Sequence, residues 1–249
     1  MLWESSIYKF RVPVDASLTE ESPLREIAID VTLSAPPFKD PGEVLSGVFE
    51  NVFDWINSRS TLTILDFGAA KLRNTIYLLE KGHTVRAVEF EKLVNKPGQA
   101  REMHEKAKRY KDRFGELVLP HSFVNSKERF DLVILINVLS TMPVPAERWM
   151  VLQYCHDKLK AGGHLFYYCM HGDAYYRKNC TEEVRIGDGY YMKKGKFKSF
   201  FREFDELEED FMFMSNGFEL AEKFIVTNNH ARLYQKKPTN LIENVNNAH

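Results

Sequence analysis

The regular alternation of β-rich and helical segments constrains this chain more than any other feature of its sequence. The short runs LTILDF, HTVRAVEF, LVLPHSF, FDLVILINVL and HLFYYCM are separated by segments whose apolar residues follow a helical period. Alternation of this kind is typical of a parallel sheet whose strands are joined by crossover helices. The run FDLVILINVL is apolar almost throughout, as expected for a strand that is covered on both faces of the sheet.

The last two β-rich runs predict a different connection. FELAEKFIV and HARLYQKK are joined by about four residues, TNNH, which is too short for a crossover helix. We therefore expect these two strands to pair antiparallel. The predicted fold is α/β: a doubly wound, mostly parallel sheet of about seven strands, with an antiparallel C-terminal hairpin and helices on both faces.

Length and composition favour one large globular domain. The chain has 249 residues, of which 44% are hydrophobic, which is enough for a substantial buried core. We expect an N-terminal extension or cap over 1–41, a core domain over 42–236 and a loose tail over 237–249. Within the core domain, 173–199 departs from the alternating pattern and is predicted to be an insertion or lid on the substrate side. The next segment predicts a helix whose buried side consists of Phe201, Phe204, Leu207, Phe211 and Met214.

The charge balance restricts the expected partners. There are 34 Lys and Arg residues against 35 Asp and Glu residues, and the net charge of −1 gives no overall electrostatic signature for nucleic acid. A local contact with nucleic acid stays open at KKGKFKSFFR, where aromatic residues are interleaved with basic ones. The sequence does not indicate an oligomeric state.

The cysteines and the N-terminus bear on the expected location. Cys155, Cys169 and Cys180 have no CxxC spacing, so we expect reduced thiols and neither a disulfide framework nor a metal site. No apolar run approaches the roughly 20 residues that cross a bilayer, and the first residues lack a signal-peptide pattern. These features favour a cytoplasmic protein without a membrane partner.

Two acids follow two neighbouring strands of the predicted sheet. Asp66 lies in TILDFGAAKLRNT at the first strand-to-helix turn, and Glu89 ends the next strand, where an acid can bind ribose hydroxyls. Because this turn has only Gly68, with Ala70 and Arg73 where GxGxxG needs glycine, it argues against NAD or FAD. A phosphate-binding GxxxxGK[ST] loop is also absent. The two acids therefore predict a ligand site at the carboxyl edge of the sheet, and the loop is not that of a dinucleotide site.

The segment 62–90 resembles motif I and the following acidic motif of class I S-adenosylmethionine (SAM)-dependent methyltransferases. RFDLVILINVLSTMP, LKAGGHLFYY, NGFEL and ARLYQKK are similar to later strands and turns of that family, so the resemblance covers about 42–236 with a gap at 173–199. It implies a methyltransferase domain that transfers a methyl group from SAM to an unidentified acceptor, with a small molecule favoured over nucleic acid or protein. The alternative is a catalytically silent module of this type that binds SAM or a partner protein.

The resemblance also implies roles for individual residues. Asp66 would reach the methionine amino group, Gly68 would allow close passage of the backbone, and Glu89 would bind the ribose. Ala70 would be tolerated with a negative φ, and Leu72 would be the first buried residue of the helix. The residues implied in cofactor binding are Asp66, Gly68, Ala69, Ala70, Glu89, Phe90 on the adenine, Ser122 and Phe123 (or His121) at its edge, and Asn137 near the methionine.

The acceptor leaves a weaker trace in the sequence. The (D/N)PPY motif of several amino-directed methyltransferases is replaced by INVLSTMP. His171 follows the fifth strand and is a candidate general base, although a histidine at a strand end more often has a structural role or is merely exposed. Tyr175 and Tyr176 are candidates for an aromatic wall or for local packing. Lys71 and Arg73 are predicted to contact the cofactor carboxylate or an anionic substrate, or else to be solvated cations.

Overall fold

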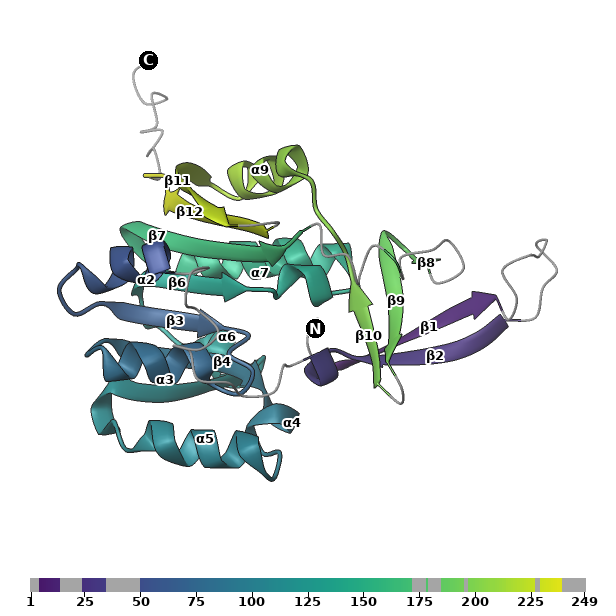
Figure 1. Ribbon diagram of the computed structural model, residues 1–249, viewed down its shortest axis with the longest axis horizontal. Helices are drawn as coiled ribbons and strands as arrows, with labels where there is room; N and C mark the ends of the chain where they lie inside the picture. The colour runs from purple at the N-terminus through teal and green to yellow at the C-terminus, as the bar shows by residue number, and fades with distance from the viewer. Residues whose placement is uncertain are drawn as a thin grey trace, which may run out of the picture.

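A seven-stranded mixed sheet forms the centre of the molecule (Figure 1). The computed structural model describes residues 5–13, 24–34, 50–171, 178, 185–194, 197–226 and 229–238. The strand order is β11-β12-β7-β6-β3-β4-β5. The strands are β3 (Thr63–Phe67), β4 (Thr84–Phe90), β5 (Phe114–Leu119), β6 (Phe130–Ile136), β7 (Leu159–Met170), β11 (Phe218–Val226) and β12 (Asn229–Lys236).

The pairing of the strands confirms the predicted fold. Strands β3 to β7 pair in parallel, whereas β12 lies antiparallel between β7 and β11. The short connection between the last two strands therefore forms an antiparallel hairpin. As a result, β11 at the edge of the sheet runs in the same direction as the parallel strands.

Helices cover both faces of the sheet because successive residues of β6 point to opposite sides. Val133 and Leu135 pack with α6 (His121–Asn125), α7 (Pro145–Lys158) and α9 (Glu206–Ser215). Leu132 and Ile134 pack with the opposite helices, which are α2 (Glu50–Asn57), α3 (Arg73–Glu80) and α5 (Gln99–Lys108). The helix that we expected to begin near residue 43 is described only from Glu50.

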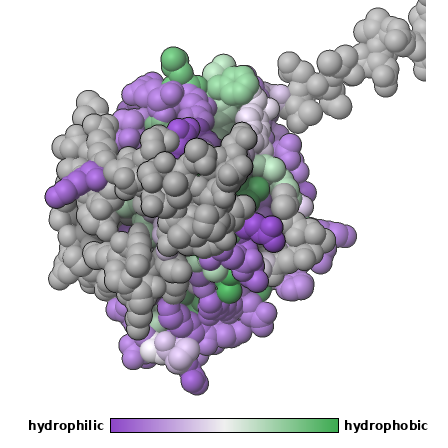
Figure 2. Space-filling model, turned by 90° about the vertical axis from the view of Figure 1, so that its right-hand side faces the viewer, coloured by the Kyte–Doolittle hydropathy of each residue, from purple (hydrophilic) through white to green (hydrophobic). Residues whose placement is uncertain are grey.

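Helix α9 faces the core with a different side from the one predicted. Leu207, Phe211 and Met214 are 83%, 66% and 55% exposed, so the prediction that they lie inward is wrong. Green spheres mark exposed apolar residues at the top of Figure 2, at the level of α9. Phe201 and Phe204 are buried, as predicted, but both precede the helix.

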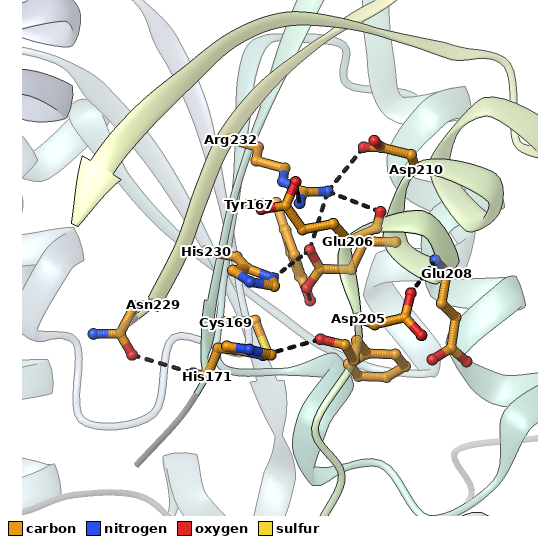
Figure 3. A network of polar contacts seen from close by, with 12 residues as sticks. Tyr167, Cys169, His171, Asp205, Glu206, Glu208, Asp210, Asn229, His230 and Arg232 are labelled. Carbon is orange, nitrogen blue, oxygen red and sulfur yellow. Dashed lines mark hydrogen bonds and ion pairs between the residues drawn. The ribbon is translucent and has the colours of Figure 1, made fainter. Parts of the chain in front are cut away.

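A buried acid explains the rotation of α9. Glu209 is fully buried on the inner side of the helix and accepts hydrogen bonds from the Tyr167 hydroxyl at 2.9 Å and from the His230 ring at 2.7 Å. Arg232 lies 3.1 Å from the same carboxylate and also donates to Asp210 at 2.8 Å (Figure 3). A buried carboxylate must find such partners, and the partners lie on β7 and β12. The helix therefore turns Glu209, Met212 and Phe213 inward.

Two small antiparallel sheets lie beside the large one, to the right in Figure 1. One consists of β1 (Ile7–Pro13) and β2 (Leu24–Asp30), followed by the short helix η1 (Val31–Ser34). The other consists of β8 (Arg185–Ile186), β9 (Gly189–Lys194) and β10 (Phe197–Phe201). We call these elements together the cover. Ile27, Ile29, Ile186, Tyr191 and Phe200 form their shared core.

The cover falls within the predicted extension or cap and the predicted lid. Its described residues belong to 1–41 and to 173–199, and β10 continues for two residues beyond the latter. Residues 42–49, where the predicted core domain begins, and 239–249 of the predicted tail lie outside the described residues. The domain boundaries stay predictions. In the described part of the chain, no helix has the length and apolar character needed to span a membrane.

Candidate active site

A cavity of about 410 Å³ lies between the large sheet and the cover. Its first side, which we call the sheet wall, is formed by residues at the carboxyl ends of β3 to β7 and in the segments that follow these strands. Its second side, the cover wall, is formed by Tyr8, Val31, Thr32, Ser199, Phe200 and Phe201. In doubly wound folds, ligands bind outside the carboxyl ends of the parallel strands, and the volume is suited to a small organic molecule.

The loop after β3 has a backbone that favours glycine. Gly68 has a φ of 75°, and a Cβ at this position would lie 2.5 Å from Cγ2 of Val138. Ala70 and Leu72 also have left-handed φ values, 50° and 61°. The condition under which we expected Ala70 to be tolerated, a negative φ, is therefore not met. Leu72 precedes the first residue of α3. Leu72 is completely buried in the core, which offsets the cost of its left-handed backbone.

Asp66 connects the end of β3 to the beginning of α3. Its carboxylate accepts a hydrogen bond from Thr75 Oγ1 at 2.5 Å and is 2% exposed. Burial raises the pKa of Asp66 to about 6, although the hydrogen bonds from Thr75 act in the opposite direction. Asp66 is not among the described residues that line the cavity. A direct contact with a methionine amino group stays a prediction.

Glu89 lines the cavity and closes the loop. Its Oε2 accepts a hydrogen bond from the backbone N–H of Ala70, and its Oε1 accepts one from that of Phe90, both at 2.8 Å. Burial raises the pKa of Glu89 to about 7 against these two hydrogen bonds. Each carboxylate oxygen still has acceptor capacity for a ligand. Phe90 lies next to it in the same wall.

Asn137 lies where β6 and β7 separate. Its φ is 54°, its backbone N–H donates to Tyr168 O at 2.8 Å, and its side-chain oxygen accepts from Met170 N at 3.0 Å. Asn137 lines the cavity, but its amide oxygen is already bonded to the neighbouring strand. The residue therefore shapes the wall through its backbone.

The residues proposed for the adenine edge lie elsewhere. Ser122 Oγ accepts a hydrogen bond from Val118 N at 2.6 Å, and the Phe123 ring is fully buried against Phe67, with 5.3 Å between ring centroids. Among the described residues, the cavity lining includes Leu119 but neither of these two nor His121. The end of the third parallel strand thus contributes through a residue that sequence reasoning did not select.

His171 belongs to the polar network beside α9 and not to the cavity wall (Figure 3). Its backbone N–H donates to Asn229 Oδ1 at 3.3 Å, and its Nδ1 donates to Phe204 O at 3.2 Å. The ring stacks on His230 with 4.2 Å between centroids. This position gives no support to a role as general base. Tyr175 and Tyr176 lie outside the described residues.

Two cations and one amide of the sheet wall have unused hydrogen-bonding capacity. Lys71 and Arg73 line the cavity and form no hydrogen bond or ion pair with another described residue, and burial lowers the pKa of each. Asn74, which sequence reasoning missed, also lines the cavity, and its buried Oδ1 has no hydrogen-bond partner among the described residues. This combination is complementary to a ligand that carries both a carboxylate and an ammonium group.

The cover is attached to the first turn of α7 by polar contacts that the sequence did not reveal. Tyr8 donates a hydrogen bond from its hydroxyl to Oε2 of Glu147. The next residue, Arg148, donates two hydrogen bonds, at 2.7 and 2.6 Å, to the carboxylate of Asp188 between β8 and β9. An acid in the first helical turn, as in PAERW, is usual, so only the burial of Glu147 and Arg148 distinguishes them.

Comparison with solved structures identifies the architecture. An S-adenosylmethionine-dependent methyltransferase from Methanosarcina mazei has a TM-score of 0.59, with 16% identity over 76% of this chain and 98% of that chain. The fold is that of the class I methyltransferases. The 1,6-didemethyltoxoflavin-N1-methyltransferase of Burkholderia thailandensis has a TM-score of 0.55, with 20% identity over 92% of this chain and 99% of that chain.

A third similar structure is the magnesium protoporphyrin IX methyltransferase of Synechocystis, with a TM-score of 0.53 and 15% identity over 75% of this chain and 80% of that chain. No protein-family model matches the sequence, and no curated protein matches it either. The residues of the cavity are therefore the basis for inferring a function.

Proposed function

We propose that this protein transfers a methyl group from SAM to a small acceptor molecule. The observation that carries the proposal is the chemistry of the sheet wall. Lys71 and Arg73, which form no hydrogen bond or ion pair with another described residue, line the same cavity as Glu89 and Phe90. Asn74 lines it too, and its buried Oδ1 has no hydrogen-bond partner among the described residues. SAM carries a carboxylate, an ammonium, two ribose hydroxyls and an adenine, for which these groups are complementary partners.

Different residues of the sheet wall would bind different parts of SAM. Arg73 and Lys71 would bind the methionine carboxylate, and Asn74 Oδ1 would accept from the ammonium. Glu89 would accept from the ribose hydroxyls, as carboxylates at this position of doubly wound folds do. Phe90 and Leu119 would pack on the adenine, and Gly68 would allow the loop to approach Val138 and the ligand together.

When bound, SAM supplies an electrophilic methyl group on a positively charged sulfur. The protein's own contribution is to align the acceptor and to exclude water. The cover supports this role because its residues close the cavity opposite the sheet wall.

The position of the cavity between two walls favours a small acceptor over a polymer. The Phe200 and Phe201 rings of KKGKFKSFFR are 1% and 4% exposed, so they are not available to stack on nucleic-acid bases. Two of the similar structures are named for small acceptors, a toxoflavin precursor and magnesium protoporphyrin IX. The proposed setting in the cytoplasm is in keeping with such a substrate.

Calorimetric titration with SAM, S-adenosylhomocysteine and NAD tests the cofactor assignment. We expect both adenosyl ligands to bind and NAD not to bind. Arg73→Met, which removes the guanidinium and keeps an extended side chain, should weaken SAM binding, and a variant of the remote Lys223 serves as a matched control. If neither adenosyl ligand binds the folded protein, the proposal is wrong. Release of S-adenosylhomocysteine during turnover then separates an enzyme from a silent module.

A further inference from the structure

A hydroxyl–carboxylate pair connects the cover wall to α7. Tyr8 lines the cavity, and its hydroxyl donates to Oε2 of Glu147. Glu147 is 3% exposed and lies in the first turn of α7. Tyr8 lies 139 residues away along the chain, so the pair exists only because the cover folds over the cavity.

The environment fixes which group of the pair holds the proton. A buried carboxylate is costly unless its charge is stabilised, and the first turn of a helix favours a negative charge. Burial, together with the neighbouring Glu147, raises the pKa of Tyr8 far above its ordinary value. Tyr8 is therefore protonated and donates to Glu147, while the lone pairs of its oxygen can accept a hydrogen bond from a molecule in the cavity.

We infer that Tyr8 is a catalytic residue that accepts a hydrogen bond from the hydroxyl of a small phenolic acceptor, with Glu147 as its positioning partner and the destination of the released proton. This inference rests on the proposed function and names its substrate class. A phenol suits the site because Val31, Met142 and Phe200 give the cavity an apolar surface for a flat ring.

The proposed step conserves atoms and charge. The acceptor oxygen forms a bond to the methyl carbon, and the electron pair of the broken carbon–sulfur bond stays on sulfur. The acceptor's proton moves to Oη of Tyr8 while the Tyr8 proton moves to Oε2 of Glu147. One positive charge on sulfur and one negative charge on Glu147 disappear together. Glu147 then returns its proton to water before the next turnover.

Two phenols of different acidity test the inference. Catechol is protonated at mildly alkaline pH, whereas 4-nitrophenol is largely ionised and has no proton to give to Tyr8. We expect Tyr8→Phe to lower kcat for catechol by about 10²-fold, a size that general-base catalysis commonly contributes. The loss in kcat for 4-nitrophenol should be several-fold smaller. Glu147→Gln should have the same selective effect. Tyr77→Phe is the matched control, because the Tyr77 hydroxyl accepts from Asn57 outside the cavity.

Binding supplies a second measurement that does not depend on turnover. Catechol should bind the protein loaded with S-adenosylhomocysteine, and Tyr8→Phe should weaken this binding several-fold without changing the affinity for S-adenosylhomocysteine. Equal losses for both phenols, or no loss, overturn the role of Tyr8. Failure of the wild-type protein to bind or methylate either phenol overturns the phenolic substrate class. In each case, intact binding of S-adenosylhomocysteine shows that the proposed function has not failed with it.

Discussion

The two walls of the cavity are built in different ways. The sheet wall comes from the carboxyl ends of successive parallel strands and from the segments that follow them. The cover wall brings Tyr8 and Val31, from the N-terminal part of the chain, together with the distant Phe200. The topology of the large sheet therefore determines the sheet wall, whereas the packing of the cover on the large sheet determines the cover wall.

The largest expected effect concerns the sheet wall alone. Glu89→Ala removes an acceptor of ribose hydroxyls and releases the Ala70 N–H. It should weaken SAM binding by one or two charge-assisted hydrogen bonds, each about 1.5–3 kcal/mol. Calorimetry on Glu89→Ala and Glu147→Gln measures this contrast, since the second variant should keep the affinity for SAM. Equal losses in both variants would show that the two walls do not act separately.

Substitution of one glycine in the sheet wall and one in the cover tests how tightly each is packed. A methyl group at Gly68 would meet Val138, and one at Gly189 would clash with the Phe200 ring and with Phe201 O. Each Gly→Ala substitution should lower the free energy of unfolding by about 1–3 kcal/mol. Only Gly68→Ala should also impair SAM binding. Chemical denaturation measures the first effect, and a combined Gly68→Ala, Val138→Ala variant should recover part of the stability.

Glu89 should give folding stability and SAM affinity opposite dependences on pH. Burial raises the pKa of Glu89 from its ordinary 4.5 to about 7, so the folded protein binds a proton that the unfolded chain releases. The contribution of Glu89 to the free energy of unfolding therefore falls as pH rises from 4.5 to 7. SAM binding, which uses the ionised carboxylate, should instead strengthen over this window by up to about tenfold per pH unit. Titrations at several pH values check this, and Glu89→Gln should abolish the dependence on Glu89.

The smallest effect is expected at Ala70. Because its φ is 50°, Ala70→Gly should raise the free energy of unfolding by up to about 1 kcal/mol. SAM affinity should be unchanged, since the backbone already has the conformation that glycine prefers. Thermal unfolding with and without SAM measures both quantities. A large loss of affinity would mean that the Ala70 side chain itself contacts the ligand.

The sequence predicted the sheet and its antiparallel hairpin. Gly68, Glu89 and Phe90, selected because they lie at strand ends, line the cavity, and their roles in binding stay predictions. These features depend on periodicity and on strand ends, which are local properties. The orientation of α9 could not be predicted because apolar spacing favoured Leu207 and Phe211, whereas the buried partners of Glu209 lie on distant strands. Hydrophobic pattern alone does not reveal such a polar anchor.

The candidate catalytic residues also show what sequence pattern cannot predict. His171 follows a strand end, as sequence reasoning required, but its ring stacks on His230. Tyr8 and Glu147 gave no signal, because their contact joins an N-terminal strand to a helix in the middle of the chain. A contact of this kind depends on tertiary packing and has no spacing in the sequence.

The first turn of α7 holds both parts of the cover at once. Glu147 binds Tyr8 of the N-terminal hairpin, and the adjacent Arg148 binds Asp188 of the second small sheet. Both small sheets are thus attached to the same helical turn, so a movement of this turn would shift both of them together. Admission of an acceptor and release of its methylated product would then be one opening event, controlled at one place in the chain.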